Sequence, residues 1–347
     1  ITDALAGRLA VRYREIDGFI DNVAKDLDEM ETEETVVRGA LRWDATENLQ
    51  VDLKLETGEF NSVGRNSIII GSPAPGGATP VLNDFTRKAA LDPEFSDNNY
   101  DNATLTLNYQ LGEFELVSTT GWSAYDYTEE VDTDFGVGST VQSPAAEDFE
   151  QLSQELRLVS PLGQTFEHIL GVFYQTSETD YAEPARITLP SVAVELDRNF
   201  FSDSDLWAVF GQSTWNVSNN FRATLGLRYT VEDKEGGRKL VTRNLDGSVF
   251  NPLGLPGFAE LGMPLPPLGV TPHDLSGERD EEVVTPLLNL QWDVATDAML
   301  YASVSTGYKA GGFDARSNRA TLPDGRPALE FEEEEALSME LGAKLGL

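Results

Sequence analysis

Apolar and polar side chains alternate at every second position along much of this chain, and this alternation constrains its fold more than any other feature. Within 103–110, for example, Leu105, Leu107 and Tyr109 alternate with polar residues. The clearest alternating segments are 5–13, 37–43, 49–56, 103–110, 221–230 and 337–345. A helix would scatter such residues around its axis, whereas a strand sorts them onto two faces. The alternation therefore predicts an all-β protein.

Weaker alternation predicts further strands between the clear ones, at 113–125, 148–159, 165–177, 204–215, 283–293 and 298–309. Segment 165–177 is apolar at both even and odd positions, as Leu170 and Phe173 show. Which of its two faces points outward therefore stays open. We expect about twelve strands.

The connections between these strands alternate between short and long. The short links, rich in Asp, Asn, Gly and Pro, are 44–48, 110–113, 160–164, 216–220 and 293–297. The long links are 16–33, 61–99, 126–147, 178–203, 232–282 and 310–333. In an up-and-down sheet this places every short turn at one rim and every long loop at the other. Outer-membrane barrels have this asymmetry, whereas Greek-key crossings in a soluble sandwich would disturb it.

The longest link, 232–282, contains five prolines and exceeds an ordinary turn, so it is expected to be a binding or gating loop. The prolines are Pro252, Pro256, Pro264, Pro266 and Pro267.

The chain has no run of about 18 apolar residues, so no transmembrane helix is expected, but a membrane-spanning strand needs only about 10 alternating residues. Aromatic residues with a polar group stand at or near the predicted strand ends, as bilayer interfaces favour. They are Tyr13, Trp43, Tyr109, Tyr174, Tyr229 and Tyr308. An ordinary aromatic core of a soluble sheet is the alternative interpretation.

Charge and cysteine content argue against several other classes. The 25 Lys and Arg residues against 59 Asp and Glu leave a net charge of −34, and nucleic acid needs a basic partner surface. Without any cysteine there is no disulfide framework, thiol catalysis or Cys-ligated zinc. Residues 1–11 show no basic segment followed by an apolar core, so no signal peptide is visible.

Catalytic and cofactor sites are not indicated. The two histidines, His168 and His273, stand in a predicted strand and a proline-rich loop, without a second His at metal-ligand spacing. Gly236-Gly237 and Gly311-Gly312 lack the strand-to-helix context and Lys of a phosphate-binding loop. Residues 132–136 hint at a calcium loop, but the ligand spacing and closing Glu are missing. We expect no enzyme, no cofactor and no resident metal.

Two charged groups suggest surfaces. Acidic clusters at the long-loop rim are either a solvated rim or a cation-bridged contact with lipopolysaccharide. Their members are Asp26, Asp28, Glu29, Glu31, Glu33, Glu34 and Glu332 to Glu335. A basic cluster projects to the inward side of two neighbouring strands, either paired with carboxylates or forming a path for an anionic ligand. It consists of Arg8, Arg12, Arg14, Arg38 and Arg42.

Five groups of segments resemble the barrels of TonB-dependent receptors, notably the iron-complex receptor-like group. Each is weak alone, but their order and spacing over nearly the whole chain make the resemblance strong. They are Ala4–Asn22 with Arg38–Trp43, Leu152–Ser160 with Leu170–Tyr174, Val209–Trp215 with Leu225–Thr230, Leu300–Phe313, and Phe331 with Glu335–Gly346.

The resemblance implies an antiparallel up-and-down transmembrane β-barrel of 22 strands, occluded by an N-terminal plug. No plug or TonB box is visible before Ile1, and the chain ends at Leu347, where family barrels continue. We therefore expect residues 1–347 to be an interior fragment of the barrel domain with about twelve of its strands.

The resemblance also implies the function: uptake of a scarce nutrient, foremost a ferric siderophore, across the outer membrane of a Gram-negative bacterium. TonB would supply energy through the plug, and outer-membrane lipid and lipopolysaccharide would surround the barrel. Loops 61–99, 232–282 and 310–333 would hold the solute, with Lys309, Phe313 and Arg316 as candidate contacts.

Two rival classes stay open at this point. A passive outer-membrane channel or other plug-less barrel would share the strand pattern. A soluble carbohydrate-binding β-sandwich would share the alternation but partition into buffer without detergent. The solute itself stays open among iron complexes, cobalamin, oligosaccharides and plant aromatics.

Overall fold

The computed structural model describes residues 3–65, 84–133, 136–138, 140–189, 192–250 and 270–346. Within these ranges no helix is long and apolar enough to cross a membrane. All the regular structure described is β-strand. The five loop prolines and residues 134–135 of the suggested calcium loop lie outside the described residues.

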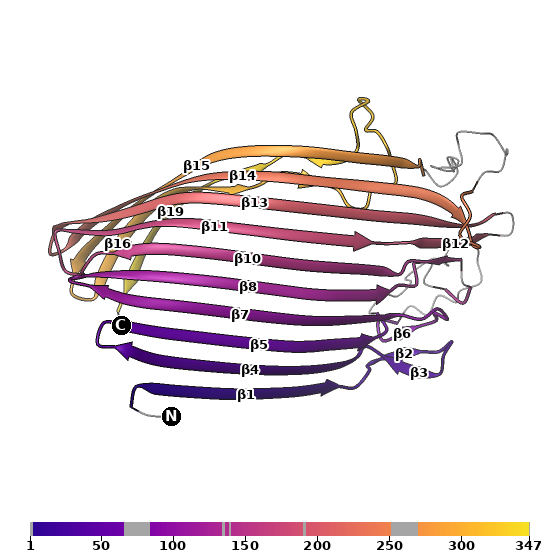
Figure 1. Ribbon diagram of the computed structural model, residues 1–347, viewed down its shortest axis with the longest axis horizontal. Helices are drawn as coiled ribbons and strands as arrows, with labels where there is room; N and C mark the ends of the chain where they lie inside the picture. The colour runs from indigo at the N-terminus through magenta and orange to yellow at the C-terminus, as the bar shows by residue number, and fades with distance from the viewer. Residues whose placement is uncertain are drawn as a thin grey trace.

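Twelve long strands form one continuous antiparallel sheet in sequence order, which confirms the predicted all-β, up-and-down topology (Figure 1). They are β1 (Leu5–Ile16), β4 (Glu31–Thr46), β5 (Leu49–Val63), β7 (Phe95–Leu111), β8 (Phe114–Glu130), β10 (Ala145–Val159), β11 (Phe166–Ala182), β13 (Val192–Ser218), β14 (Phe221–Asn244), β15 (His273–Ala295), β16 (Ala298–Lys309) and β19 (Glu334–Leu345). The sheet curls, so that β16 and β19 run behind the strands in front of them. It is not closed, because β1 and β19 are both edge strands.

Seven short strands accompany the sheet. They are β2 (Ile20–Asn22), β3 (Leu27–Glu29), β6 (Arg87–Lys88), β9 (Val141–Gln142), β12 (Ala185–Leu189), β17 (Gly312–Phe313) and β18 (Glu330–Phe331). Most of them lie at the long-loop rim, at the right of Figure 1, while the short turns lie together at the left. The predicted separation of short turns from long loops is thus confirmed.

The two faces of the sheet differ in chemistry. Cross-strand register places Leu9, Leu41 and Leu225 on one face, here called the outer face, where large apolar side chains are exposed on strand after strand. The opposite, inner face carries polar side chains such as Gln212 and Thr224. Exposed apolar side chains that continue across a whole sheet are what a lipid-facing surface requires.

On four strands of this apolar face, two aromatic residues stand eight positions apart and so form two rows. The pairs are Phe114 and Trp122, Phe166 and Tyr174, Trp215 and Trp207, and Phe221 and Tyr229. Eight residues span about 26 Å of strand, or about 20 Å along the barrel axis at a tilt of about 40°. The rows therefore enclose a band somewhat shorter than the apolar band of about 25 Å that outer-membrane barrels show.

The polar atoms of the row nearer the long loops donate hydrogen bonds toward that rim. Trp122 Nε1 donates to Glu150 (2.8 Å), Tyr174 Oη to Asp205 (2.8 Å) and Tyr229 Oη to Glu282 (2.7 Å). Each carboxylate lies on the neighbouring strand, two positions further from the apolar band. This is the arrangement of interfacial aromatics, with the ring toward lipid and the polar group toward water.

Beyond this row the outer face becomes acidic. Asp126, Asp148 and Asp180 are direct cross-strand neighbours, and Asp203 pairs in register with Glu178 and Glu235. Like charges directly opposite one another destabilise a sheet unless water or counterions screen them. Part of the net charge of −34 thus lies on strand surface above the apolar band.

Several strands continue far past the apolar band, contrary to the predicted loops 178–203 and 232–282. β13 has 27 residues, β14 has 24 and β15 has 23, whereas about 10 suffice to cross a membrane. Those predictions were wrong over 192–203, 232–244 and 273–282. Beyond the apolar band neither face carries a row of exposed apolar side chains, so the alternation that reveals a strand fades. A buried cluster of Val194, Leu196 and Leu240 packs there instead.

At the long-loop rim β2, β3 and β6 form a small sheet around a buried charge cluster. The Lys88 ammonium pairs with Glu29 and Glu94, and all three are almost fully buried. Burial raises the pKa of Glu94, with Lys88 opposing it only in part. For Glu29 burial also acts upward, but hydrogen bonds from Lys88, Asn22 and Lys25 prevail and lower its pKa. Glu29 is therefore not part of a solvated acidic rim.

Candidate ligand-facing site

The segment between β16 and β19, residues 310–333, folds back over the inner face and is here called the strap. Its ring residue Phe313 is buried against two glycines of the sheet, Gly236 of β14 and Gly277 of β15. These glycines are cross-strand partners. A Cβ atom on Gly277 would lie 3.1 Å from the Phe313 ring, and one on Gly236 would overlap it. The glycine pair thus provides the space that seats the strap.

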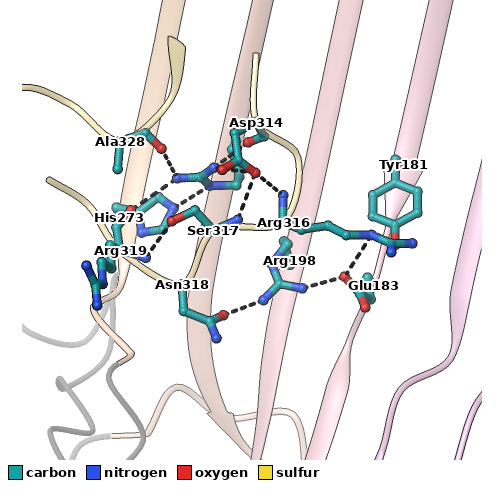
Figure 2. A network of polar contacts seen from close by, with 11 residues as sticks. Tyr181, Glu183, Arg198, His273, Asp314, Arg316, Ser317, Asn318, Arg319 and Ala328 are labelled. Atoms are coloured by element: carbon teal, nitrogen blue, oxygen red, sulfur yellow. Dashed lines mark hydrogen bonds and ion pairs between the residues drawn. The ribbon is translucent and has the colours of Figure 1, made fainter. Parts of the chain in front are cut away.

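A fully buried arginine of β14, Arg238, fixes the strap by its main chain (Figure 2). Its guanidinium donates to the carbonyl oxygens of Asp314, Arg319 (3.1 Å) and Ala328 (2.5 Å). Its Nε donates to Nε2 of His273 (2.9 Å). Removing this buried guanidinium would leave several acceptors unpaired, which is destabilising.

His273 serves this arrangement as a neutral acceptor. Its Nδ1 lies 2.7 Å from the carbonyl oxygen of Thr271, which accepts its proton, while Nε2 accepts from Arg238. Burial lowers the pKa of His273, and the nearby Arg238 charge lowers it further against the opposing hydrogen bond to Thr271. A proton on Nε2 would place two donors face to face.

A second arginine, Arg198 of β13, clamps the outer part of the strap. One guanidinium nitrogen donates to Glu183 and another to the side-chain oxygen of Asn318. The Asn318 carbonyl oxygen accepts from the Thr271 amide (2.9 Å). The strap is therefore joined to β13, β14 and the segment before β15.

Beside the strap lies a pocket of about 350 Å³ on the inner face. It is lined by Glu147, Thr179, Tyr181, Phe200, Asp314, Ala315 and Arg316. The Arg316 guanidinium carbon lies 5.3 Å from the centre of the Tyr181 ring, and its Nε donates to the Tyr181 hydroxyl (3.0 Å). Figure 2 shows Arg316 extending from the strap toward Tyr181.

The three predicted contact residues have different positions. Lys309 ends β16 with an exposed side chain opposite Glu334. Phe313 is buried and anchors the strap, so it contacts protein. Arg316 lines the pocket, and 63% of its side chain is exposed. Of the three, Arg316 alone has the exposure and position suited to a solute.

The five predicted basic residues share the inner face of β1 and β4. Three are paired with carboxylates: Arg12 with Glu34 (3.0 Å), Arg38 with Glu56, and Arg42 with Asp52 (2.7 Å). Arg8 and Arg14 lie beside them with exposed side chains. Pairing within the sheet accounts for three of them, and their role in solute passage stays a prediction.

The predicted interface aromatics Tyr13, Trp43, Tyr109 and Tyr229 all expose their rings on the outer face. Tyr308 is placed differently. It is half-buried, and its hydroxyl donates to Glu281, which also accepts from the Gly311 amide of the strap. Tyr308 thus belongs to the base of the strap, because β16 parts from β15 beyond Ser305.

Sequence reasoning missed Arg238 and Arg198, which hold the strap, and placed His273 in a loop without a role. All three fall in ranges predicted as loop, and nothing in their neighbours marks a buried cation. Gly236 and Gly277 would have been a signal in a recognised strand, where glycine indicates close approach of another group, but both lie in a range predicted as loop. No group of three or more His, Cys, Asp or Glu in the described part of the chain is placed to hold a metal ion.

An up-and-down antiparallel sheet with a lipid-type outer face and a polar inner face is the architecture of the wall of an outer-membrane barrel. Residues 42–347 match the family described as TonB dependent receptor-like, β-barrel. The chain therefore belongs to the TonB-dependent receptor β-barrel family. Members of this family are receptors and transporters of the Gram-negative outer membrane, not enzymes.

Solved structures show the same fold at low sequence identity. The ferric yersiniabactin uptake receptor FyuA from Yersinia pestis is 15% identical with a TM-score of 0.77, and the match covers 100% of this chain and 48% of that one. The ferric-catecholate import receptor Fiu from E. coli is 13% identical with a TM-score of 0.66, and the match covers 99% of this chain and 52% of that one. The copper transporter OprC is 11% identical with a TM-score of 0.63, and the match covers 99% of this chain and 47% of that one. This chain spans about half the length of the structures it matches.

Proposed function

We propose that this chain is part of an outer-membrane receptor that takes up a scarce solute with energy supplied through TonB. The observation that carries the proposal is the strap, a long-rim loop fixed in the interior by Arg238 and bordering a pocket. The buried guanidinium holds this loop in one position, so the inner face beside the pocket is preformed. A receptor needs such a preformed, ligand-facing surface.

The solute proposed is a ferric siderophore or a similar metal chelate. Support comes from similar structures whose titles describe ferric yersiniabactin and ferric-catecholate receptors. The copper transporter with the same fold shows that another metal is compatible with this architecture. TonB enters the proposal because the family is defined by dependence on it, and because an outer membrane has no nucleotide supply of its own.

The proposed surroundings follow from the outer face. Lipid would contact the band between the two aromatic rows, and lipopolysaccharide would lie beside the acidic surface above it. The carboxylates there would require divalent cations next to lipid phosphates, since like charges repel. The short turns would face the periplasm and the strap the cell exterior.

Uptake measurements test the proposal. The gene is deleted in its host, and accumulation of radioactive iron supplied as ferric siderophores is compared with and without plasmid-borne receptor. We expect receptor-dependent uptake that disappears when tonB is also deleted. Uptake that persists without TonB would instead identify a passive channel, and a protein recovered in buffer without detergent would exclude both.

A further inference from the structure

The ladder of hydrogen bonds between β15 and β16 ends partway along the two strands. They pair from the short-turn rim only as far as Leu287 and Ser305, although β15 continues to His273. Beyond Ser305, β16 pairs with β19 alone, up to Lys309. The two strands therefore separate while β16 is still part of the sheet.

Pro286 explains where the ladder ends. The Asp293 amide donates to the Asn220 carbonyl oxygen on the β14 side, so even-numbered residues of β15 direct their backbone groups toward β16. Continuing the register would next place Pro286 opposite Thr306. Proline has no N–H to donate to the Thr306 carbonyl oxygen, so the ladder cannot continue at this position.

A cavity of about 270 Å³, here called the window, lies where the strands separate. Its lining includes consecutive residues of one strand, Val283 and Val284 of β15, and of another, Ala336 and Leu337 of β19. Successive side chains of a strand point to opposite faces, so the window extends through the plane of the sheet. Gly307 of β16 leaves it open, because a Cβ atom there would have only that of Ala336 within 4 Å.

Contacts at the base of the strap close the window toward the long-loop rim. The Tyr308 hydroxyl donates to the Glu281 carboxylate, which also accepts from the Gly311 amide (3.0 Å). Toward the short turns, the ladder at Leu287 and Ser305 closes it. The window is thus a bounded opening in the sheet and not the free end of two diverging strands.

The window lies at the height of the aromatic row nearer the long loops. Val284 is the cross-strand partner of Tyr229, a member of that row. Val284 and Leu337 are 53% and 61% exposed on the outer face, so they continue the apolar band up to the opening. Lipid that covers this band therefore reaches the window at interfacial depth, where acyl chains meet polar linkages.

Backbone groups that the ended ladder leaves unpaired face the window. By the alternation described above, these are the N–H and C=O groups of Val284 and Thr306 and the C=O group of Pro286. Within the described residues none of them has a hydrogen bond. Backbone groups in contact with lipid are strongly destabilising unless they are paired, so an occupant must bring both donors and acceptors.

We infer that the window binds a lipid of the outer leaflet. Its acyl chain would lie against Val283, Val284 and Leu337, and its ester or amide linkage and hydroxyl groups would pair with the free backbone groups. The inference concerns the surrounding membrane, so it stands whether or not the proposed solute is correct.

Other occupants satisfy fewer of these groups. Water alone would pair with the backbone but leave the apolar side chains wet, and a plain hydrocarbon would leave the backbone unpaired. An anionic solute would meet the Glu335 carboxylate, and none of the described residues that line the window is cationic. A molecule with an apolar chain and a neutral polar linkage suits both parts of the window.

Photo-crosslinking of the intact receptor in lipid nanodiscs tests the inference. The probe is phosphatidylcholine with a diazirine in one acyl chain, and labelled residues are mapped by mass spectrometry after proteolysis. We expect labels on outward-facing residues such as Leu227 and also on two inward-facing residues of the window, Val283 and Ala336. Ser123, inward-facing beside Trp122 of the same aromatic row, should stay unlabelled.

Filling the window supplies the matched pair of variants. Gly307→Leu should abolish the labels on Val283 and Ala336 while the label on Leu227, which reports correct insertion, stays at its wild-type level. Ser123→Leu adds the same side chain to the inner face at a similar height and should change neither.

Three outcomes would overturn the inference. The first is wild-type protein with no label on the inward-facing residues of the window. The second is equal labelling of Ser123, because the probe would then reach the inner face everywhere. The third is labelling of Val283 that survives in correctly inserted Gly307→Leu.

Discussion

At the scale of single residues, buried charge decides where the strap lies. Arg238 is fully buried, and its donors satisfy three carbonyl oxygens that would otherwise lack partners on the inner face. His273 must stay neutral to accept from it. The guanidinium of Arg238, supported by the neutral His273, thus binds the strap at three carbonyl oxygens spread over residues 314–328.

Replacing Arg238 with Met should release the strap while leaving the transmembrane sheet intact. Leaving three carbonyl oxygens unpaired costs about 3 kcal/mol in total, which corresponds to a loss of about 100-fold in amide protection. Hydrogen exchange followed by mass spectrometry would measure this over residues 312–331. Arg326→Gln, at an exposed site of the same strap, should leave protection unchanged, and equal protection in both variants would refute the anchoring role.

Acid should weaken strap docking through His273. Its pKa in the docked state lies below the value of about 6.5 expected when the strap is undocked, so the neutral form is favoured by docking. The contribution is complete above about pH 6.5 and is lost as pH falls through the lowered docked-state pKa. Strap protection measured against pH should show this decline in wild type.

His273→Gln removes the titrating group, so its strap protection should not decline over the same pH range. The chain contains one other histidine, His168, which is exposed on the outer face and provides the control. His168→Gln should retain the decline of wild type. A decline that survives in His273→Gln would assign the pH dependence to other groups.

At the scale of elements, the position of the strap depends on two glycines in the strands beneath it. Gly236 and Gly277 weaken β14 and β15 locally, since glycine offers no side chain to pack, but they create the seat of Phe313. The long extension of the strands past the membrane places this seat at the height of the pocket. Strand length and glycine position together locate the site.

Gly236→Ala should displace Phe313 and destabilise strap docking by about 1–3 kcal/mol, the cost of overpacking a close contact. Gly39, in β4, has no atom within 4 Å of an added Cβ, so Gly39→Ala should be neutral or stabilise by about 0.5–1 kcal/mol. Proteolysis within the strap and thermal unfolding of the whole protein measure the two effects. Similar results for both variants would contradict the packing argument.

At the scale of the whole molecule, the sheet separates two environments. The outer face carries an apolar band between aromatic rows, and the inner face carries paired charges and polar side chains. The same substitution should therefore have opposite consequences on the two faces. Successive side chains of a strand point to opposite faces, so the face on which a position lies decides whether the substitution destabilises the protein or is tolerated.

Arginine introduced midway between the aromatic rows tests this division. Leu225→Arg on the outer face should destabilise the membrane-inserted protein by about 2–4 kcal/mol. Gln212→Arg lies at nearly the same height on the inner face and should be tolerated. The fraction of heat-modifiable, folded protein in outer-membrane preparations measures both. Equal losses would indicate that the apolar face does not meet lipid.

The twelve strands, their order and the two rims could be predicted from the sequence, because a strand between lipid and water must alternate. Residues 103–110 and 221–230 show this directly. The outward position of Trp43 and Tyr229 follows from the same parity. The strand extensions at 192–203 and 273–282 could not be predicted, because above the membrane neither face imposes a pattern.

The sequence by itself determined which residues face outward and how the chain runs up and down, since parity along a strand is a local property. The tertiary structure alone decided that Arg238, His273 and Asp314 meet: the pairing of β14 with β15 places Arg238 beside His273, and Asp314 joins them when the strap folds inward. Arg316 acquires its place over Tyr181 in the same way, from residues 135 positions apart. A contact between distant segments depends on how the sheet curls, and no local pattern of side chains encodes that curvature.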